Sequence, residues 1–308
     1  ELCQWISEKA MELGVDIFPG FPAQKYLTDE SGRVIGIATG DMGIDKEGNQ
    51  KGTYTPGMDI LAKQTIFAEG ARGHLGKKLI KEFNLDKGKT PQHFAIGFKE
   101  VWEVDNDKHS PGDVVHSMGW PLKGGTSGGG FLYHFDNNRI AVGLIVDLNY
   151  SNPSHSPFQE FQQFKQHPSI KQYLESGKRV SYGARAITKG GINSLVKMEF
   201  DGGMIVGCDA GTLNPSKIKG SHCALQSGIL AAEYINKVLS EENCDFDDLF
   251  KSSALYKELY ESRNFSAAMH KFGFYLGAAY NFIESNIFRN KLPFTIKDEN
   301  RDCDSLSL

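Results

Sequence analysis

The chain has 308 residues, ordinary apolar content, 34 glycines and a formal net charge of −4. This length suits one large domain or two interleaved ones, and the slightly acidic balance excludes the basic surface that a nucleic-acid partner requires. The abundance of glycine predicts tight turns and close approach of the backbone to a bound group, often a nucleotide.

Cysteines are few and none forms a Cys-x-x-Cys pair. An odd number at wide spacings argues against a disulfide framework and against a metal site built within the chain. We therefore expect reduced thiols and no metal ligand, with Cys208 and Cys223 acting as small buried hydrophobic residues. The cysteines are Cys3, Cys208, Cys223, Cys244 and Cys303.

The first 89 residues combine helices with short strands. An apolar periodicity predicts a helix over residues 1–14 that ends at Gly14, and another should run from His74 to Phe83. Turn residues predict reversals at 29–32 and 45–49. Strands are expected at 15–18, 26–27, 34–39 and 60–67.

From about residue 90 to 200 the pattern changes to strands joined by short polar turns. Such spacing predicts a mostly antiparallel sheet, interrupted by one helix at 158–166. The expected strands are 94–102, 114–120, 129–135 and 140–148.

A strand–turn–helix pattern then returns. A short buried strand is expected at 204–208, followed by a Gly-rich turn and a long helix at about 221–239. The stretch 252–290 should be helical and is rich in aromatic residues.

The turn after residue 207 carries the strongest chemical signal. A buried strand ends in Asp209, Gly211 follows, and a helix begins near Ser221. Flavin enzymes of the glutathione-reductase-like fold use such an acid near the ribityl chain or pyrophosphate, and point the positive end of a helix at the flavin ring. A plain strand-to-helix turn of any α/β protein is the alternative interpretation.

A second strand exit, Thr65–Gly73, is like the other flavin-contacting strand of that fold. Its alternative interpretation is a strand end that simply needs a flexible residue.

Seven motifs between residues 67 and 222 together resemble the electron transfer flavoprotein–ubiquinone oxidoreductase family, and the similarity runs in order from residue 1 to about 296. They are Phe-Ala-Glu-Gly-Ala-Arg-Gly-His-Leu (67–75), Gly-Trp-Pro-Leu (119–122), Phe-Leu-Tyr-His (131–134), Ser-Pro-Phe-Gln-Glu-Phe (156–161), His-Pro-Ser-Ile (167–170), Tyr-Gly-Ala-Arg-Ala (182–186) and Lys-Ile-Lys-Gly-Ser-His (217–222).

The resemblance implies a mixed α/β (α+β) fold in which a quinone-binding domain interrupts a glutathione-reductase-like FAD-binding domain. It places the FAD-binding domain at 1–89 and 201–240, a sheet-rich ubiquinone-binding domain at 90–200, and a helical membrane-associated region at 241–308. The family's phosphate loop would precede Glu1 and its cluster cysteines would follow Leu308, so we expect a fragment that is inactive alone, in which Cys303 is not a cluster ligand.

The resemblance also implies an oxidoreductase that passes electrons from reduced electron transfer flavoprotein to membrane ubiquinone. The full-length protein would carry FAD and one [4Fe-4S] cluster. Because the mechanism is electron transfer, we nominate no catalytic residue, nucleophile or metal ligand. Two alternatives stay open: a geranylgeranyl-reductase-like flavoenzyme, or a non-catalytic fragment that binds quinone or membrane.

Site residues follow from the matching motifs. The quinone headgroup would lie against the backbone of Gly128 and Gly129. The alternative is that these glycines only form a Gly-rich hairpin tip. Ser127 departs from the family pattern, which has a larger residue at position 127. Asn193 could offer its amide to the flavin or form an ordinary Asx turn. His134 and His222 could supply protons to a quinone, but we interpret both as structural histidines. The expected FAD contacts are Ala68, Glu69, Gly70, Asp209, Gly211, Lys219, Gly220 and Ser221.

Residues 272–288 form an aromatic-rich segment flanked by basic residues. It is too short to span a bilayer but suits the membrane interface; a buried core helix is the alternative. The resemblance implies a peripheral, monotopic protein on the inner membrane. It would lie on the bacterial cytoplasmic face or on the mitochondrial matrix face, and the Gly-Cys-Asp-Ala-Gly variant favours the bacterial alternative.

Overall fold

A computed structural model describes residues 2–123 and 125–306, and these divide into two compact units. Residues 1, 124 and 307–308, which belong to the predicted N-terminal helix, quinone-binding domain and C-terminal region, lie outside the described part. One unit extends to Ile66 and includes Asp201–Met204; the other contains Phe67–Phe200 and the chain from Ile205 onward. The predicted domain boundaries differ from this division and stay a prediction.

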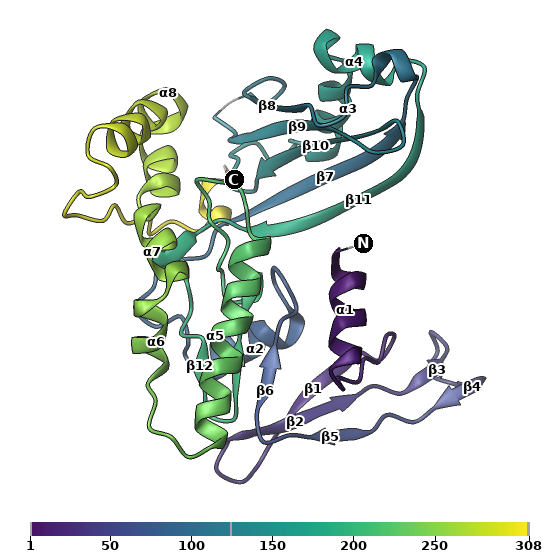
Figure 1. The fold of residues 1–308 in the computed structure, drawn as a ribbon, viewed down its shortest axis with the longest axis vertical. Coiled ribbons are helices and arrows are strands. Elements are labelled where there is room, and N and C mark those ends of the chain that lie inside the picture. Colours follow the sequence, from purple (N-terminus) through teal and green to yellow (C-terminus); the bar gives the residue numbers. More distant parts are fainter. Residues whose placement is uncertain (1, 124, 307–308) are drawn as a thin grey trace. The chain divides into compact units, whose positions relative to one another are not determined.

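The first unit contains one helix and two antiparallel sheets (Figure 1). Helix α1 (Leu2–Glu12) ends before Gly14, whose φ of +86° suits a glycine. The larger sheet has the order β1–β2–β5, and β3 and β4 form a separate hairpin. The strands of these two sheets are β1 (Ala23–Thr28), β2 (Val34–Thr39), β3 (Met42–Ile44), β4 (Gln50–Thr55) and β5 (Asp59–Leu61).

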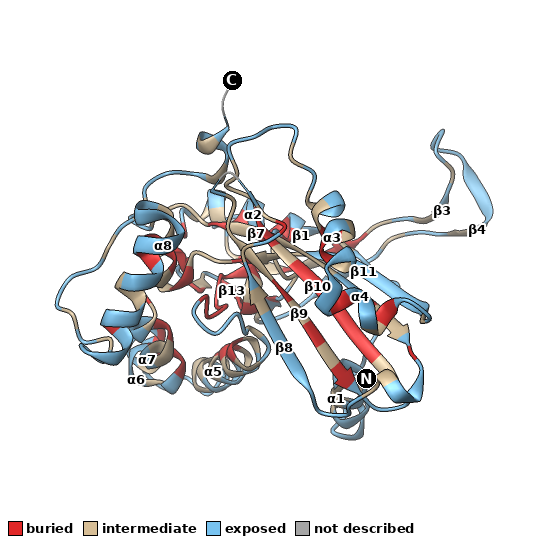
Figure 2. Ribbon diagram, turned by 90° about the horizontal axis from the view of Figure 1, so that it is seen from above, coloured by how far each residue is buried: buried red, intermediate tan, exposed pale blue. Residues whose placement is uncertain are grey.

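A five-stranded antiparallel sheet dominates the second unit, with the order β11–β7–β10–β9–β8. Buried residues are concentrated along the central strand β10 (Figure 2). The strands are β7 (Phe94–Glu103), β8 (Val114–Met118), β9 (Gly128–Phe135), β10 (Arg139–Asp147) and β11 (Lys178–Thr188).

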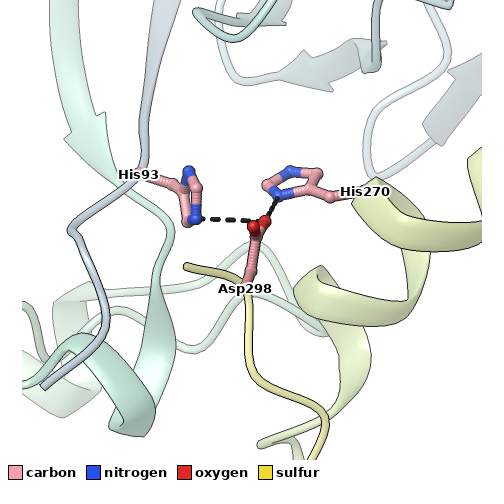
Figure 3. Close-up of side chains that lie close together, drawn as sticks. All are labelled: His93, His270 and Asp298. Carbon is pink, nitrogen blue, oxygen red and sulfur yellow. Dashed lines mark hydrogen bonds and ion pairs between the residues drawn. The ribbon is translucent and has the colours of Figure 1, made fainter. Parts of the chain in front are cut away.

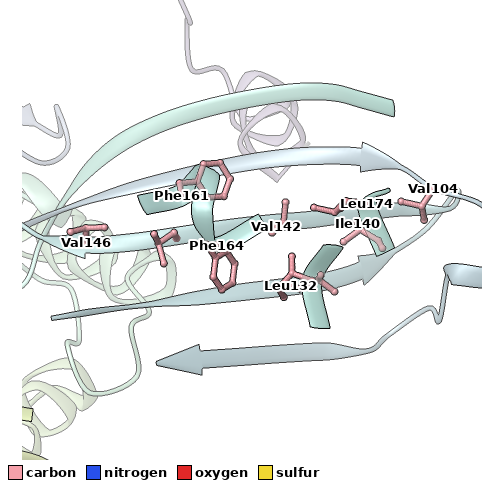
Figure 4. Packing of buried hydrophobic residues seen from close by; sticks show 10 residues of the cluster. Val104, Leu132, Ile140, Val142, Val146, Phe161, Phe164 and Leu174 are labelled. Atoms are coloured by element: carbon pink, nitrogen blue, oxygen red, sulfur yellow. The ribbon is translucent and has the colours of Figure 1, made fainter. Parts of the chain in front are cut away.

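Two helices pack on this sheet and close its core. Helix α3 (Pro157–Gln166) begins where the Ser156 hydroxyl accepts a hydrogen bond from the Gln159 N–H, with Pro157 in the first turn, an arrangement that favours helix initiation. Phe161 and Phe164 of α3 meet apolar side chains of the strands (Figure 4). The buried cluster comprises Val104, Leu132, Ile140, Val142, Leu144, Val146, Phe161, Phe164, Ile170 and Leu174.

The remaining elements carry the predicted flavin segments and the C-terminal helices. Short strands β6 (Thr65–Phe67), β12 (Glu199–Phe200) and β13 (Gly203–Ile205) form a sheet with the order β12–β13–β6. The helices are α2 (His74–Glu82), α4 (Pro168–Leu174), α5 (Ser221–Leu239), α6 (Phe246–Ser252), α7 (Ala254–Glu261) and α8 (Phe265–Asn286), with 3-10 turns at η1 (Asn106–Lys108), η2 (Gly191–Ser194), η3 (Gly207–Asp209) and η4 (Asp302–Ser305).

Several predicted elements are wrong or incomplete. No strand forms at 15–18, where the side chains are exposed, and the strand predicted at 60–67 is broken between β5 and β6. Strand β11 was not predicted, because most of its side chains are polar, small or exposed and show no apolar alternation. Helices α4 and α6 are too short to give a clear periodic signal.

Helix α8 bends at Gly273, which has a φ of +72° that does not belong to a helix. Among the described residues, no helix combines the length and apolar character needed to cross a membrane.

Candidate functional site

The turn that carries Asp209 is fixed against helix α5. Gly207 adopts a φ of +65°, and its N–H donates a hydrogen bond of 2.9 Å to the Ser227 hydroxyl on α5. The positive φ favours glycine at this position. The turn therefore leaves β13 sharply and directs η3, with Asp209 at its end, along the start of the helix.

Asp209 lies beside the second predicted flavin segment. The Glu69 N–H donates to the Asp209 carboxylate at 3.3 Å, and the Val206 N–H donates to the Phe67 carbonyl at 3.0 Å. The structure thus brings Asp209 together with Ala68–Gly70, which are about 140 residues away in the chain.

The Glu69 side chain is used within the protein. Its carboxylate accepts hydrogen bonds from the Leu75 and Gly76 N–H groups at 2.9 and 2.8 Å, and His74 Nδ1 lies 3.0 Å from its other oxygen. A carboxylate at the positive end of α2 is stabilised there. Because its N–H also bonds Asp209, Glu69 can offer a ligand its backbone carbonyl rather than its N–H or its carboxylate.

Glycine is required where backbone approaches Asp209. A Cβ atom at Gly76 would lie 2.3 Å from an Asp209 oxygen, closer than van der Waals contact allows. Gly211 has a φ of +98°, and a Cβ there would lie 2.5 Å from the Gln92 amide nitrogen. Gly76 thus lets α2 pack against the Asp209 carboxylate, and Gly211 lets the turn after η3 pack against the Gln92 side chain.

Burial raises the pKa of Asp209 to about 6, and the neighbouring Glu69 charge adds to this effect. The carboxyl also lines a cavity of about 440 Å³. Four cations border the same cavity, which would suit an anionic group. They are Arg72, Lys77, Lys89 and Arg301.

The start of α5 lies on the other side of the predicted turn. The Asn214 N–H bonds the Lys219 carbonyl at 3.0 Å, and Lys219 Nζ lies 3.4 Å from the Tyr133 hydroxyl on β9. No side chain caps the helix at Gly220, so the first-turn N–H groups near Ser221 are available to a ligand. Lys219 therefore contacts the sheet, and no described hydrogen bond or ion pair joins it to Asp209.

Gly128 and Gly129 open strand β9 and line a small apolar cavity of about 80 Å³. They pair with Val146 and Ile145 of β10. A Cβ atom would lie 2.2 Å from the Ile145 carbonyl oxygen at Gly128, and 2.7 Å from the Ser117 carbonyl oxygen at Gly129. Both glycines are thus required by strand packing, and they leave bare backbone at the cavity wall.

Apolar side chains from β8, β10, α8 and the 213–220 loop complete this cavity, which we call the glycine cavity. They are Met118, Ile145, Pro215, Ile218, Phe265, Met269 and Phe274, and the polar lining residues are Ser127, Asp147, Lys189, Ser266 and His270.

Other predicted residues have structural partners. The buried His134 ring accepts the Ser110 N–H at 3.1 Å and packs edge-on against Tyr173, and His222 Nε2 lies 2.8 Å from Glu258. The Asn193 amide donates to the Arg263 carbonyl at 2.8 Å, so it is engaged in joining η2 to the α7–α8 connection.

The prediction for the two cysteines holds for one of them. Cys223 is buried, but Cys208 is only half-buried, because it sits in the sharp η3 turn rather than within a strand.

A cluster of two histidines and two aspartates was not predicted, since its members are far apart in sequence and form no motif. Asp298 lies 2.8 Å from His270 Nδ1 and 3.2 Å from His93 Nε2 (Figure 3). Asp302 lies 2.7 Å from His93 Nδ1. The cluster borders a polar cavity of about 850 Å³, called here the polar cavity.

Hydrogen bonds and ion pairs within this cluster shift the pKa values of its members. Burial lowers the pKa of His93, but hydrogen bonds to Asp298 and Asp302 outweigh burial and raise it to about 9. Burial opposes ionisation of Asp298, yet the hydrogen bonds from His270 and His93 hold its pKa far below the usual range. Ligand atoms of His93, His270 and Asp298 lie within 4.8 Å of one another, as do those of His222, Cys223 and Glu258. In the first group these atoms are paired with one another, since both histidines contact Asp298.

Comparison with known proteins gives a family match over part of the chain. Residues 94–187, which span β7 to β11, match the model described as "ETF-QO, ubiquinone-binding".

Curated relatives match nearly the whole chain. An electron transfer flavoprotein-ubiquinone oxidoreductase from Pseudomonas aeruginosa is 58% identical over 98% of this chain and 56% of its own length. Mitochondrial proteins of the same name from Arabidopsis thaliana and Homo sapiens are 46% and 45% identical, covering 100% and 99% of this chain and 49% and 52% of their own lengths. The chain therefore spans about half the length of the curated relatives it matches.

Solved structures share the fold at low identity. A geranylgeranyl bacteriochlorophyll reductase-like protein from Thermoplasma acidophilum has a TM-score of 0.62 at 18% identity, covering 83% of this chain and 59% of that one. A flavin-dependent brominase has a TM-score of 0.56 at 16% identity, covering 94% of this chain and 67% of that one. The chain therefore shares its mixed helix-and-sheet fold with these two proteins.

Proposed function

The chain belongs to the electron transfer flavoprotein–ubiquinone oxidoreductase family, and from this premise we propose that the whole protein passes electrons from reduced electron transfer flavoprotein to membrane ubiquinone. The observation that carries the proposal is the coincidence of two features. The ubiquinone-binding match covers β7 to β11, and the glycine cavity lies at the end of that sheet, where β8, β9 and β10 meet α8.

The glycine cavity has the chemistry that a quinone headgroup needs. Its walls are mainly apolar, as is typical of small-molecule sites, and Gly128 and Gly129 present backbone rather than side chains. A flat ring could lie against this bare backbone. Met118, Ile218 and Phe274 are exposed at the surface, so the same wall can meet an isoprenoid tail.

FAD is the cofactor proposed for the whole protein. The close-packed glycines around Asp209, the buried carboxyl and the uncapped start of α5 fit a ribityl chain and flavin ring. When bound, FAD would supply the electron-carrying ring. The residues proposed to hold it are Ala68, Glu69, Gly70, Asp209, Gly211, Lys219, Gly220 and Ser221.

The role of this part of the chain is to bind and orient. Asp209 would accept a hydrogen bond from a cofactor hydroxyl, and α5 would direct its N–H groups at the ring. We also propose a [4Fe-4S] cluster for the whole protein. The cysteines of the described residues are all free and offer no ligand set for it.

Helix α8 and the segment after it are proposed to contact the membrane interface. Eight large apolar side chains of this region are more than two-fifths exposed, a density that exceeds scattered surface hydrophobes. They are Phe272, Phe274, Tyr275, Leu276, Phe282, Ile283, Ile287 and Phe288. Since α8 also walls the glycine cavity, quinone could enter from lipid at an inner membrane to which the protein binds peripherally.

The likeness to the geranylgeranyl reductase-like protein concerns fold alone at 18% identity, so it gives no support to an isoprenoid-reducing activity.

The test of the proposal is electron transfer by the full-length, FAD-loaded protein. Enzymatically reduced electron transfer flavoprotein should bleach the flavin, and added short-chain ubiquinone should restore its absorbance with net quinol formation. Flavin that stays oxidised with this donor, or stays reduced with quinone, would contradict the proposal.

A further inference from the structure

Reduction of a quinone to a quinol consumes two electrons and two protons, and an apolar cavity must obtain those protons from a titratable group. This inference rests on the proposed function, which supplies the electrons and the quinone. Within the described residues, three titratable side chains line the glycine cavity: Asp147, Lys189 and His270.

Asp147 and Lys189 are committed to each other. Lys189 Nζ lies 2.6 Å from both carboxylate oxygens, and the Asp147 side chain is only 4% exposed. If Lys189 gave its proton to a quinone, a buried carboxylate would lose its partner, which is strongly unfavourable. This pair is therefore better suited to fixing the cavity wall than to moving protons.

His270 occupies a different position, because it borders both cavities. Its ring lines the apolar glycine cavity and also the polar cavity. The side chain is 9% exposed, and Nδ1 is held by Asp298 at 2.8 Å (Figure 3). In the described part of the chain, Nε2 has no hydrogen-bond partner, so it can transfer a proton.

We propose that His270 is the proton donor for quinone reduction and that Asp298 is its positioning residue. In each transfer the Nε2–H bond of the imidazolium breaks and a new O–H bond forms on the reduced quinone oxygen. The neutral imidazole is then reprotonated by a proton that enters from the bulk solvent through the polar cavity, which His270 also lines. Two such transfers, with two electrons from the donor, balance the conversion of quinone to quinol.

The hydrogen bond to Asp298 determines which nitrogen acts. An anionic Asp298 keeps the proton on Nδ1, which leaves Nε2 as the nitrogen that gives its proton to the quinone. The charged groups near the ring belong to the cluster and to the linings of the two cavities. His93, Asp298 and Asp302 belong to the cluster, Asp147 and Lys189 face it across the glycine cavity, and Lys271, Lys297, Glu299 and Arg301 line the polar cavity.

The test uses the full-length, FAD-loaded protein and the variant His270→Gln. Quinone reduction should fall about 100-fold or more, as expected for loss of a general acid, and should lose a titrating limb of its pH profile. Added imidazole should restore part of the rate. Flavin reduction by the donor and flavin oxidation by ferricenium, which takes up no proton, should stay at wild-type rates, and affinity for a short-chain quinone should be retained.

His109→Gln is the matched control. Its Nε2 contacts the Phe135 carbonyl at the far end of β9 from Gly128, so this variant should behave as wild type. Asp298→Asn keeps the imidazole but removes its anionic partner, and should shift the pH profile even if His270→Gln does not fold.

Two results would overturn the proposal. One is wild-type quinone turnover with an unchanged pH profile in His270→Gln, or in Asp298→Asn if only that variant folds. The other is an equal loss with quinone and with ferricenium that imidazole does not restore, which would indicate a structural role. A wild-type protein that reduces no quinone would remove the proposed function, and this inference with it.

Discussion

The Glu69 N–H donates a hydrogen bond to the Asp209 carboxylate at 3.3 Å and thereby joins the strand exit after β6 to the turn after β13. The contact buries a carboxyl group next to the Glu69 side chain. Because the charged form is disfavoured there, the contact has consequences for stability as well as for cofactor binding.

Asp209 should make the stability of the cofactor-free protein fall with rising pH. The pKa of Asp209 is raised to about 6, above its unfolded value of about 3.9. Its contribution is therefore complete below about pH 4 and is lost as pH rises through about 6, by up to about 3 kcal/mol. Asp209→Asn still accepts the Glu69 hydrogen bond but carries no charge.

Urea unfolding at pH 5 and pH 8 measures this effect. The decrease in unfolding free energy from pH 5 to pH 8 should be smaller in Asp209→Asn than in wild type. Asp136→Asn, at an exposed position in the β9–β10 hairpin, should follow wild type. Equal pH dependence in wild type and Asp209→Asn would show that Asp209 does not titrate in this range.

Glu100 should be the most sensitive carboxylate of the five-stranded sheet. Its side chain is 3% exposed and accepts hydrogen bonds from Lys165 at 2.8 and 3.0 Å. Trp102 and Arg179 also bond it. Burial raises the pKa of Glu100, but these partners lower it overall. Removing Lys165 alone leaves a buried charge without its main partner.

Lys165→Met should lower the unfolding free energy by about 3 kcal/mol, and Glu100→Gln combined with Lys165→Met should recover part of that loss. Denaturant titration of the three proteins measures both quantities. The control is Arg139→Met, which breaks the half-exposed pair with Glu103 and should cost less than about 1 kcal/mol. A Lys165→Met loss as small as the control's would refute the buried-pair account.

Gly128→Ala should disturb the sheet even before any ligand is considered. The added Cβ would meet the Ile145 carbonyl oxygen, a backbone atom that cannot move alone. Overpacking of this kind costs about 1–3 kcal/mol. Gly183→Ala on β11 is the matched control, since a Cβ there meets no atom within 4 Å. Thermal unfolding should separate the two; equal melting temperatures would contradict the packing at Gly128.

Charges on α8 should weaken membrane binding. Leu276 and Phe282 are 70% and 65% exposed, and each side chain contributes about 1.5–3 kcal/mol when buried in an apolar medium. Leu276→Glu and Phe282→Glu should therefore each reduce co-sedimentation with phosphatidylcholine vesicles about tenfold. Ile229→Glu on α5, at a 66% exposed position, should bind normally. Undiminished binding of both α8 variants would exclude this surface.

Local patterns predicted the elements that carry strong periodicity. Helix α5 has the predicted bounds, and β2, β7, β9 and β10 agree within one residue. Strand β11 was not predicted, because its composition carries no strand pattern. It forms a strand through its pairing with β7 at the edge of the sheet. The strand predicted at 60–67 is divided because β5 pairs with β2, whereas β6 pairs with β13 in a different sheet.

The same contrast between local patterns and long-range pairing applies to the site residues. Asp209 lies in a recognisable strand–turn–helix pattern, and Gly128 was nominated through the family resemblance, since its local pattern alone suits a hairpin tip. The close approach of Asp209 to Glu69, and of Gly128 to Ile145, depends on pairing between distant segments. His93, His270 and Asp298 had no local signal, because a charge cluster assembled from three separate segments has no fixed spacing.

The central claim is that the glycine cavity binds the quinone, and photolabelling of the full-length protein tests it most directly. A short-chain azido-ubiquinone should label peptides that contain Met118, Gly128–Gly129 or Phe265–Phe274, the walls of the cavity. Excess ubiquinone should abolish the labelling, as mapped by mass spectrometry. Competable labelling confined to peptides outside these segments would contradict the account.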